Sequence, residues 1–581
     1  MTPLAHRMRT TAAWASIATL TACSNTSGIL SKLKAPARPP QLAAAQGSAL
    51  KACDQLGSRF SFAQTVLDSA SSVPAGNLKV GSTSISEHCL VKGRMHQRKG
   101  SDGRDYAIGF EMRLPSNWNG RFYYQGNGGL DGAVVPAQGA LGGGPVTGAL
   151  AQGFAVISSD AGHSGPQTPF FGMESQARLD YGYQAVGKLT PMAKELIQAA
   201  YGKAPDRSYI GGCSNGGRHA MVAAARYGDQ YDGYLIGAPG YRLPNAALAQ
   251  LWGAQQWQTI ATPGTTVKHP MNPNGTLADL GSAFTAQERQ TVANAVLDKC
   301  DALDGLRDGI VHNTQACQAT FKLETDVATC KSARNGNCLS AAQKKVIAST
   351  YAGGKTDKGD TIYASFPYDP GIAGANWATW KFVNSLALDP LAVGSVFSVP
   401  PGRVDPLSEN INSRWPLLQA SNDSYRESGL ALMTPPGHER PVNLQALRER
   451  GAKMVLYHGV SDPIFSAEDT RQWYSRLNQV QGGQVADFAR YFPVPGMNHC
   501  SGGPATDQFD LLSALVQWVE QGQAPQSVVA GVRGANNAGG ANSELPAQWS
   551  AQRTRPLCAY PTVAQYQGKG DIENAASFAC R

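Results

Sequence analysis

The stretch that decides the fold reads Tyr209-Ile210-Gly211-Gly212-Cys213-Ser214-Asn215-Gly216-Gly217, and an alanine-rich helical pattern follows it over 218–225. It contains Gly212-x-Ser214-x-Gly216, which is typical of a sharp turn between a strand and a helix. A serine on such a turn has strained backbone angles, and the flanking glycines avoid collisions. Its hydroxyl is exposed above the sheet, and the next backbone N–H points at a developing oxyanion. The chain has 64 glycines, so a chance match is the alternative; the pattern nevertheless occurs once, between the required strand and helix.

Length and composition describe a large globular protein. A chain of 581 residues exceeds one ordinary core, which predicts two domains or one domain with a large insertion. Hydrophobic residues make up 42% and charged residues 16%, which is ample for a core. The net charge of +8 is modest, and no basic run is interleaved with aromatic residues. We therefore expect no nucleic-acid partner.

The N-terminus has the pattern of an exported bacterial lipoprotein. A basic start precedes an apolar run over 11–19, which is too short to span a bilayer permanently. The next residues, 20–23, read Leu-Thr-Ala-Cys and resemble a lipobox, so 1–22 is expected to be a signal peptide and Cys23 to be lipidated. An ordinary cleaved signal peptide is the alternative. Residues 23–48, rich in Ala, Pro, Ser and Lys, predict a flexible tether. The expected location is the cell envelope, either anchored in the outer membrane by this lipid alone or periplasmic or secreted.

The remaining cysteines predict disulfides. Eleven cysteines less Cys23 leave ten, and an even set in an exported protein is typical of disulfide bonding. No pair has the C-x-x-C spacing of a zinc site. Spacing alone leaves the connectivity open.

Strand and helix patterns alternate along the first half of the chain. Large apolar residues alternate at period two over 108–114, and a short buried strand follows at 122–124. Another strand is expected at 154–160, helical patterns at 175–202, and a strand at 234–240. This alternation predicts an α/β fold with a mostly parallel sheet and helices on both faces.

A glycine-rich loop over 125–132 directly follows one of these strands. It lacks a G-x-G-x-x-G pattern before a helix and a Walker lysine, which argues against a nucleotide site. In an α/β-hydrolase the second oxyanion N–H comes from this place. Gly129 is the candidate donor.

Regularity then fails over 241–445, which is rich in long loops, Gly, Pro and Asn. This segment predicts a large lid domain inserted into the hydrolase core. Sheet-like patterns resume at 453–458 and near 488–494. The core is therefore expected to comprise 49–240 and 446–581.

Two further residues complete a candidate catalytic triad. Asp462 and His499 each follow a predicted strand, in the chain order Ser–Asp–His of α/β-hydrolases. Ser214 would attack a carbonyl, His499 would accept and later return its proton, and Asp462 would orient the imidazole. Asp469 is the weaker alternative acid, and His458 is interpreted as a pocket-wall or core histidine.

Cysteines flank the triad. Cys213 precedes the serine and Cys500 follows the histidine, so a formed triad would bring their backbones close. A disulfide between them would clamp nucleophile to base. Two free buried thiols are the alternative.

An acidic turn in the lid has the composition of a calcium site. Asp301, Asp304 and Asp308 lie within eight residues, and carboxylate oxygens are ligands that Ca²⁺ prefers. The carbonyls of Leu306 and Ile310 would complete the shell. The spacing is not that of an EF-hand, and an ordinary acidic turn is the alternative.

Several of these motifs together resemble the tannase and feruloyl esterase family. The matching pieces are Gly212 to Arg218, Cys300 to Gly305, Tyr457 to Gly459 with Asp462, Val494 to Gly503, and Arg553 to Cys558. The resemblance extends over about 50–581. It implies hydrolysis of esters of aromatic acids, and a structural Ca²⁺ held by the five residues of the acidic turn. It also implies five disulfides, namely Cys53–Cys89, Cys213–Cys500, Cys300–Cys317, Cys330–Cys338 and Cys558–Cys580.

The resemblance further implies residues around the substrate. Asn215 and Gly129 would supply the oxyanion N–H groups. By similarity to the terephthalate-monoester hydrolases of the family, His458, Phe465 and Trp380 would line an aromatic pocket. Asn215 stands where those enzymes have a glutamate.

One departure from the pattern affects the expected substrate. The lid arginine that grips a terephthalate carboxylate has no clear counterpart, and Lys381 is a poorer substitute because it lacks a bidentate fork. Esters of neutral phenolic acids, gallate-like or ferulate-like, are therefore the leading hypothesis. A terephthalate-monoester hydrolase is the alternative, and a non-catalytic, ligand-binding surface lipoprotein is the second.

Overall fold

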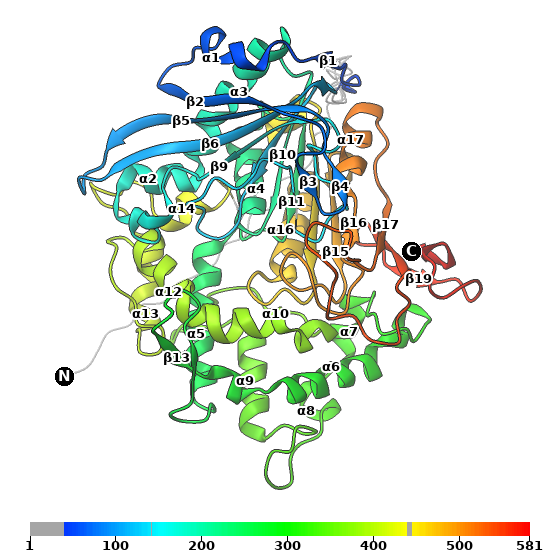
Figure 1. The fold of residues 1–581 in the computed structure, drawn as a ribbon. Helices are drawn as coiled ribbons and strands as arrows, with labels where there is room; N and C mark the ends of the chain where they lie inside the picture. Colours follow the sequence, from blue (N-terminus) through cyan, green and yellow to red (C-terminus); the bar gives the residue numbers. More distant parts are fainter. Residues whose placement is uncertain (1–39, 141, 438–443) are drawn as a thin grey trace, which may run out of the picture. The chain divides into compact units, whose positions relative to one another are not determined.

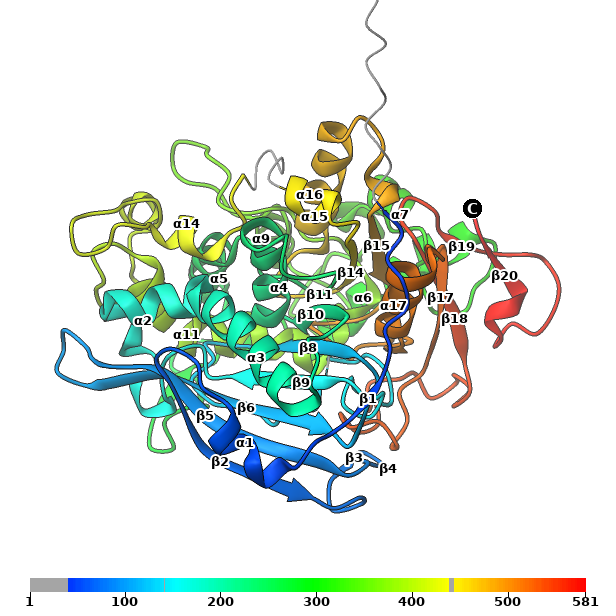
Figure 2. The same cartoon turned by 90° about the horizontal axis from the view of Figure 1, so that it is seen from above.

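The computed structural model describes residues 40–140, 142–437 and 444–581. In these residues a sheet of nine strands runs in the order β15-β14-β11-β10-β8-β9-β6-β5-β2. Its strands are β2 (Thr65–Val73), β5 (His88–Lys99), β6 (Asp105–Pro115), β8 (Arg121–Gly126), β9 (Ala155–Ser159), β10 (Arg207–Cys213), β11 (Gly233–Gly237), β14 (Lys453–Gly459) and β15 (Ala489–Val494). Neighbours from β15 to β9 are parallel, and β9, β6, β5 and β2 pair antiparallel. The predicted mostly parallel sheet is confirmed, with β2 and β5 at the edge farthest from β15 (Figure 2).

Helices cover both faces of this sheet, and alternate side chains of its parallel strands enter two different hydrophobic clusters. Phe122 and Tyr124 pack in the larger cluster, which also contains residues of α3, α4 and α16. Tyr123, between them, packs in a second cluster with residues of α17. The helices are α3 (Ala185–Tyr201), α4 (Asn215–Arg226), α16 (Ala467–Val480) and α17 (Leu511–Gln521).

The inserted segment begins with α5 (Leu243–Gln258), whose first half packs into the larger core cluster. A separate cluster that includes Trp257, Phe284, Trp377 and Phe382 forms the interior of the lid. Figure 1 shows α6, α8, α9 and α10 gathered at the end far from β2 and β5. The helices of the inserted segment after α5 are α6 (Ala286–Cys300), α7 (Thr314–Thr320), α8 (Leu323–Asp326), α9 (Ala341–Tyr351), α10 (Ala375–Ala378), α11 (Ser385–Ala387), α12 (Asp389–Ala392), α13 (Ile411–Arg414) and α14 (Gly429–Met433). Helix α15 (Gln445–Glu449) lies at the start of the second part of the core.

Shorter elements border the core. A three-stranded sheet pairs β16 (Gln508–Phe509), β17 (Ser527–Gly531) and β18 (Thr554–Cys558). Near the C-terminus β19 (Ala564–Tyr566) pairs with β20 (Phe578–Cys580). Two short helices, α1 (Leu56–Arg59) and α2 (Ser175–Leu179), precede α3.

The beginning of the described chain corrects the expected tether. Residues 40–48 were expected to be part of a flexible linker, but they lie against the core. Gln41 Nε2 donates to the carbonyl of Val519 (2.7 Å), and the N–H of Ala45 donates to Glu520 (3.0 Å). Strand β1 (Ser48–Ala49) then pairs with β7 (Asn117–Trp118). The sequence of this segment suggested a linker because its apolar residues show no helix or strand periodicity. The segment is held by hydrogen bonds to the core, and these do not require a periodic pattern of side chains. Cys23 and residues 1–39 lie outside the described residues.

All five expected disulfides are confirmed. They join Cys53 to Cys89, Cys213 to Cys500, Cys300 to Cys317, Cys330 to Cys338 and Cys558 to Cys580. Five such bonds indicate an oxidising, extracytoplasmic compartment.

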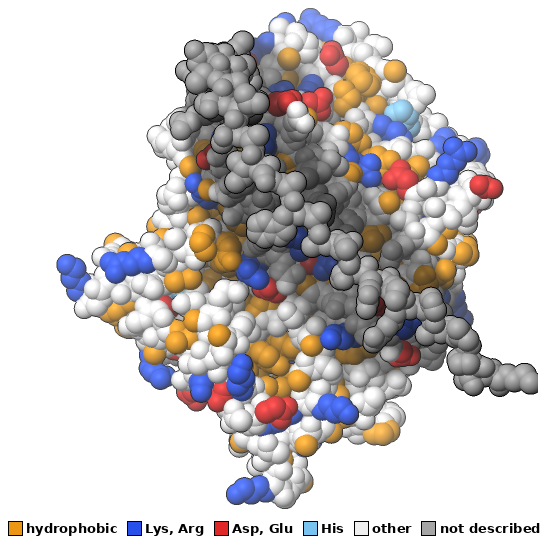
Figure 3. Space-filling model, turned by 180° about the vertical axis from the view of Figure 1, so that it is seen from behind, with side chains coloured by type: hydrophobic (Ala, Val, Ile, Leu, Met, Phe, Trp, Pro, Cys, Tyr) orange, Lys and Arg blue, Asp and Glu red, His pale blue; other side chains and the backbone are white. Residues whose placement is uncertain are grey.

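The surface charge and the helix lengths bear on what the protein can contact. On the face shown in Figure 3, outside the grey atoms, Lys and Arg side chains are dispersed among acidic and apolar ones. Of the helices in the described residues, none combines the length and the apolar character that crossing a bilayer requires.

Candidate active site

The turn between β10 and α4 has the strained geometry expected of it. Ser214 lies between the strand and the helix with φ +66°, in the left-handed region. A Cβ on Gly212 or Gly216 would collide with the carbonyl oxygen of Gly126. The two glycines are therefore required because the turn packs directly against the end of β8, where the glycine-rich loop begins.

Ser214, His499 and Asp462 form a continuous series of hydrogen bonds. The Ser214 hydroxyl donates to Nε2 of His499 (2.8 Å). Nδ1 of His499 donates to Oδ2 of Asp462 (2.7 Å). The structure thus brings together three side chains from positions separated by up to 285 residues. This arrangement can transfer the serine proton to an imidazole that a carboxylate orients.

The Asp462 carboxylate is buried and held on both oxygens. Its Oδ1 accepts from the backbone N–H groups of Ile464 and Phe465, each at 2.9 Å. Burial by itself would raise its pKa, but the His499 imidazole and hydrogen bonds from His458 and His499 outweigh burial and hold the pKa below its ordinary value. Asp462 is therefore ionised at neutral pH and ready to stabilise an imidazolium.

The position of His458 fits a core histidine, one of the two interpretations given above, and not a residue that lines an aromatic pocket. Its side chain has no exposed surface. Nε2 donates to the carbonyl of Phe465 (2.8 Å) and lies 3.3 Å from Asp462 Oδ2, while the Thr470 hydroxyl donates to Nδ1 (2.9 Å). His458 thus supports the acid loop from within the core, because both ring nitrogens already have protein partners.

Two aromatic rings flank the histidine. The Trp380 and Phe465 rings each pack edge-to-face on the His499 imidazole, with centroids 5.0 and 5.3 Å away. Trp380 is half-buried and comes from the lid, whereas Phe465 is buried and belongs to the acid loop. The structure therefore brings both expected aromatic residues to the base, where an aromatic acyl group would lie.

Lys381 has an environment that does not suit carboxylate binding. Its side chain is buried, with Nζ 3.9 Å from the centroid of the Phe366 ring and 3.4 Å from Gln250 Oε1. Gln250 in turn donates to the carbonyl of Pro463 (2.8 Å), in the acid loop. Burial lowers the pKa of Lys381 to about 7. This ammonium group is engaged within the protein.

The two expected oxyanion donors belong to the glycine-rich loop and to the start of α4, both next to Ser214. Gly129 has φ +64°, and its carbonyl accepts from the Tyr181 hydroxyl (3.1 Å). Asn215 is the first residue of α4, so its N–H is one of the free donors at a helix N-terminus. A Cβ built on Gly128 would lie 3.9 Å from the Ser214 Cβ, so the loop passes beside the nucleophile.

A buried polar network behind these donors was not expected from the sequence. Asp131 Oδ2 accepts from Asn215 Nδ2 and lies 2.9 Å from His219 Nε2, and the Arg218 guanidinium donates to Asn215 Oδ1 (2.6 Å). Burial raises the pKa of Asp131 well above its usual range, and burial lowers that of His219. The network ties the glycine-rich loop to α4. Its one sequence signal was an aspartate within the glycine-rich loop.

The acidic turn in the lid fits a cation in part. Asp304 Oδ2 is buried without a hydrogen-bond partner, and burial together with the Asp308 carboxylate raises the Asp304 pKa to about 7. Such an oxygen would be satisfied by a cation. However, Asp308 Oδ2 pairs with Arg555 (2.9 Å to Nε), and Asp301 accepts from the N–H of Gly309. Within the described residues, no three acidic, His or Cys side chains are already arranged as a metal cluster.

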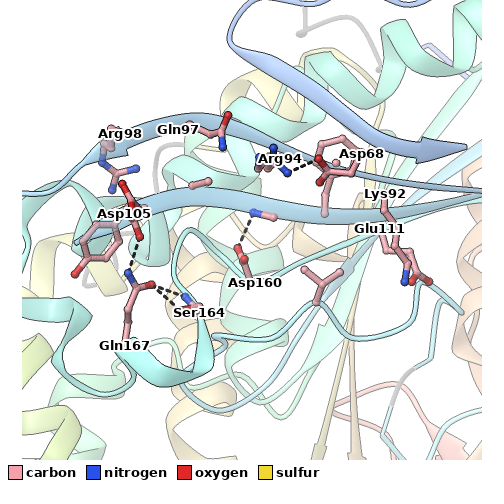
Figure 4. A pocket seen from close by; sticks show the side chains of 16 residues that line it. Asp68, Lys92, Arg94, Gln97, Arg98, Asp105, Glu111, Asp160, Ser164 and Gln167 are labelled. Atoms are coloured by element: carbon pink, nitrogen blue, oxygen red, sulfur yellow. Dashed lines mark hydrogen bonds and ion pairs between the residues drawn. The ribbon is translucent and has the colours of Figure 1, made fainter. Parts of the chain in front are cut away.

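A polar cavity of about 490 Å³ lies beside β5 and β6 (Figure 4). Asp160 projects toward it, and its Oδ1 accepts from the backbone N–H groups of Gly109 (3.0 Å) and Gly162 (2.9 Å). Burial raises the pKa of Asp160 to about 7. Exposed Asp105 lines the same cavity.

The parallel sheet, and the turn that carries Ser214 at the end of β10, place the chain in the α/β-hydrolase class. Comparison with known proteins identifies the family within this class. The sequence model described as "Tannase and feruloyl esterase" matches residues 89–581. The mono(2-hydroxyethyl) terephthalate hydrolase of Piscinibacter sakaiensis is 36% identical over 560 residues, covering 89% of each chain.

Solved structures agree on the fold. Feruloyl esterase B from Aspergillus oryzae has a TM-score of 0.70 at 23% identity, covering 91% of this chain and 99% of its own. Tannin acyl hydrolase from Aspergillus niger has a TM-score of 0.63 at 19% identity, covering 91% and 94%. The chain belongs to the tannase and feruloyl esterase family, and it is a carboxylic ester hydrolase.

Proposed function

We propose that this protein hydrolyses esters of aromatic acids through an acyl-enzyme on Ser214. The observation that carries the proposal is the unbroken hydrogen-bond series from Ser214 through His499 to Asp462. The family membership and the two aromatic rings against His499 support the substrate class.

The reaction proceeds in two halves. Ser214 Oγ attacks the ester carbonyl carbon while its proton passes to His499 Nε2, and the N–H groups of Gly129 and Asn215 stabilise the oxyanion. Collapse of this intermediate breaks the bond to the alcohol, which leaves with the proton from His499. Water then attacks the acyl-enzyme and gives its proton to His499. The second collapse releases the acid and returns the proton to Ser214.

The acyl group that the site favours is a neutral aromatic one. Trp380 and Phe465 offer apolar ring edges beside the base, and Lys381 is occupied by Gln250 and the ring of Phe366. A phenolic acyl group of the gallate or ferulate type fits these surroundings without burying an unpaired charge.

The test compares the wild type with Ser214→Ala on an activated aryl ester, methyl gallate, methyl ferulate and mono(2-hydroxyethyl) terephthalate. We expect the wild type to turn over the phenolic esters, and the variant to lose on the order of 10³-fold or more in kcat. Equal rates from the two proteins would refute the proposal. Stoichiometric labelling of Ser214 by a fluorophosphonate separates an enzyme from a silent ligand-binding lipoprotein.

A terephthalate-monoester hydrolase is the second candidate. It is favoured by the 36% identity to the Piscinibacter enzyme, whose name states that substrate. If this candidate is right, the monoester will be cleaved with a kcat/KM above those of methyl gallate and methyl ferulate.

We further propose that the acidic turn binds a structural Ca²⁺ in the lid. The carboxylates of Asp301, Asp304 and Asp308 and the carbonyls of Leu306 and Ile310 would hold it. The cation would neutralise the mutual repulsion of the buried carboxylates, and no step of the hydrolysis depends on it. The unpartnered Asp304 oxygen supports this proposal.

Lipidation of Cys23 and anchoring at the outer membrane remain proposals for the exported chain, since that cysteine lies outside the described residues. Radiolabelled palmitate incorporation into the wild type, but not into Cys23→Ser, would support the anchor.

A further inference from the structure

One segment of the lid lies in direct contact with both loops that carry the acid and the base of the triad. It includes the short 3₁₀ turn Pro370–Ala373. A Cβ on Gly371 would collide with the carbonyl oxygen of Gly496 and with the Ser461 side chain. A Cβ on Gly374 would collide with Asn498 Oδ1. Only glycine permits this approach, so the lid backbone contacts the two loops with no side chain of its own between them.

A single carboxylate joins the three segments. Asp369 is 1% exposed, and its Oδ1 accepts from the Ser461 hydroxyl (2.5 Å) and the N–H of Gly371 (3.1 Å). Its Oδ2 accepts from the N–H of Gly496 (3.3 Å). Ser461 immediately precedes Asp462, and Gly496 lies three residues before His499. One lid residue is therefore hydrogen-bonded to the acid loop and to the base loop.

Neighbouring contacts complete this junction. Asn498 Nδ2 donates to the carbonyl of Gly371 (2.9 Å), and the N–H of Ser461 donates to the carbonyl of Met497 (3.1 Å). Burial raises the pKa of Asp369, while its hydrogen bonds from Ser461, Gly371 and Gly496 oppose the rise. Because the site is buried, lost hydrogen bonds would not be replaced by bulk water.

We propose that Asp369 is a positioning residue of the triad: by binding Ser461 and Gly496 with one carboxylate, it sets the separation of Asp462 and His499. The kinetic part of this inference rests on the proposed esterase function. A small displacement between reacting groups is enough to lower turnover by about 100-fold. The lid thus contacts the base in two ways, through the Asp369 hydrogen bond to Gly496 and through the Trp380 ring on His499.

The test is Asp369→Asn, which keeps the size of the side chain but replaces one acceptor oxygen by a donor. We expect kcat to fall on the order of 10- to 100-fold, as for other supporting residues around an active site, with KM within about threefold. The acid limb of the kcat/KM profile should move to lower pH, because a displaced Asp462 stabilises the His499 imidazolium less. Ser461→Ala removes one of the three donors and should give a smaller change of the same kind.

The matched control is Glu288→Gln. Glu288 is also a 1% exposed carboxylate of the lid, but its partners are Arg334 and Thr285, which lie outside the triad loops. This variant should lower thermal stability without changing kcat or the acid limb. A double variant of Asp369→Asn with Ser461→Ala should be no worse than Asp369→Asn alone, because both changes act on one hydrogen bond.

A readout independent of turnover separates this inference from the proposed function. The proton between His499 Nδ1 and Asp462 Oδ2 is expected to give a strongly downfield NMR resonance in the wild type, which should shift or broaden in Asp369→Asn and stay unchanged in Glu288→Gln. An unchanged resonance and unchanged kcat in a folded Asp369→Asn protein would overturn the inference. If the wild type has no esterase activity but the resonance still responds, the positioning role stands and the proposed function fails.

Discussion

A single buried side chain next to the nucleophile turn links the two segments that carry the proposed oxyanion donors. Asp131 belongs to the same loop as Gly129 and bonds the side chain of Asn215, so one carboxylate links the segments that carry both donors. The Ser214 hydroxyl donates to His499 and not to this carboxylate. The role of Asp131 is therefore expected to be geometric.

Removal of this link should lower turnover more than substrate binding. In Asp131→Ala, the Asn215 amide loses its partner and the loop is free to move away from α4. We expect kcat to fall on the order of tenfold or more with a smaller change in KM, measured on an activated aryl ester. Asp131→Asn keeps an acceptor and serves as the milder comparison. A kcat equal to that of the wild type in the alanine variant would contradict this role.

Asp160 should make stability depend on pH. Its folded-state pKa of about 7 lies above the ordinary value of 3.8. Between about pH 4 and 7 the folded protein holds a proton that the unfolded chain has released, so the Asp160 contribution to stability falls as pH rises through this window. Asp160→Asn keeps an acceptor for both backbone N–H groups and removes the free-energy cost of ionising a buried carboxyl group.

Chemical unfolding at pH 4.5 and pH 8 measures the effect. The free energy of unfolding of Asp160→Asn, relative to the wild type, should rise by on the order of 1–2 kcal/mol between the two pH values, after allowance for partial solvent exposure. Asp105→Asn, at an exposed position on the same cavity, should show no such difference. A relative stability that is flat with pH would refute the prediction.

Two strands and a helix pack in direct backbone contact at the nucleophile turn. β10, α4 and the end of β8 approach so closely that Gly126, Gly212 and Gly216 lie backbone to backbone. The disulfide between Cys213 and Cys500 then ties this turn to the base loop across 287 residues of sequence.

Replacement of this disulfide should loosen the site and destabilise the fold. In Cys213→Ser with Cys500→Ser, the unfolded chain regains the freedom of a long loop, so the free energy of unfolding should fall by about 2–5 kcal/mol. The same change in Cys330→Ser with Cys338→Ser, which opens a loop of only 8 residues, should cost less. Activity after folding should drop only in the first pair. The opposite order in thermal unfolding would contradict this account.

Local sequence patterns predicted the strands, the helices and the nucleophile turn well. They did not predict side-chain contacts between elements that are distant in the sequence. The strand–turn–helix around Ser214, the order of acid and base, and the five disulfides follow from short motifs and from the family resemblance. Asp369 gave no signal, because its partners Ser461 and Gly496 are far away in the chain. His458 was assigned to the pocket on resemblance, whereas its neighbours Thr470 and Phe465 enclose it only once α16 has packed.

For the whole molecule, the lid has a hydrophobic interior of its own, and the proposed cation would stabilise the acidic turn, where the lid contacts Arg555 of β18. Removal of Ca²⁺ by EGTA should lower the thermal unfolding temperature by several degrees, and added Ca²⁺ but not Mg²⁺ should restore it. Asp304→Asn should reduce this response. An unfolding temperature that chelation leaves unchanged would count against the calcium site.

The contact between the lid segment of Gly371 and Gly374 and the two triad loops limits how such enzymes can be recombined. A chimera that exchanges the whole lid to obtain a new substrate range also removes the lid contacts that support the loops of Asp462 and His499. Chimeras joined outside this segment should therefore turn over every ester more slowly, whatever the shape of their new pocket. Grafts that retain the segment from Asp369 to Gly374, and change only the lid on either side of it, should inherit a working triad.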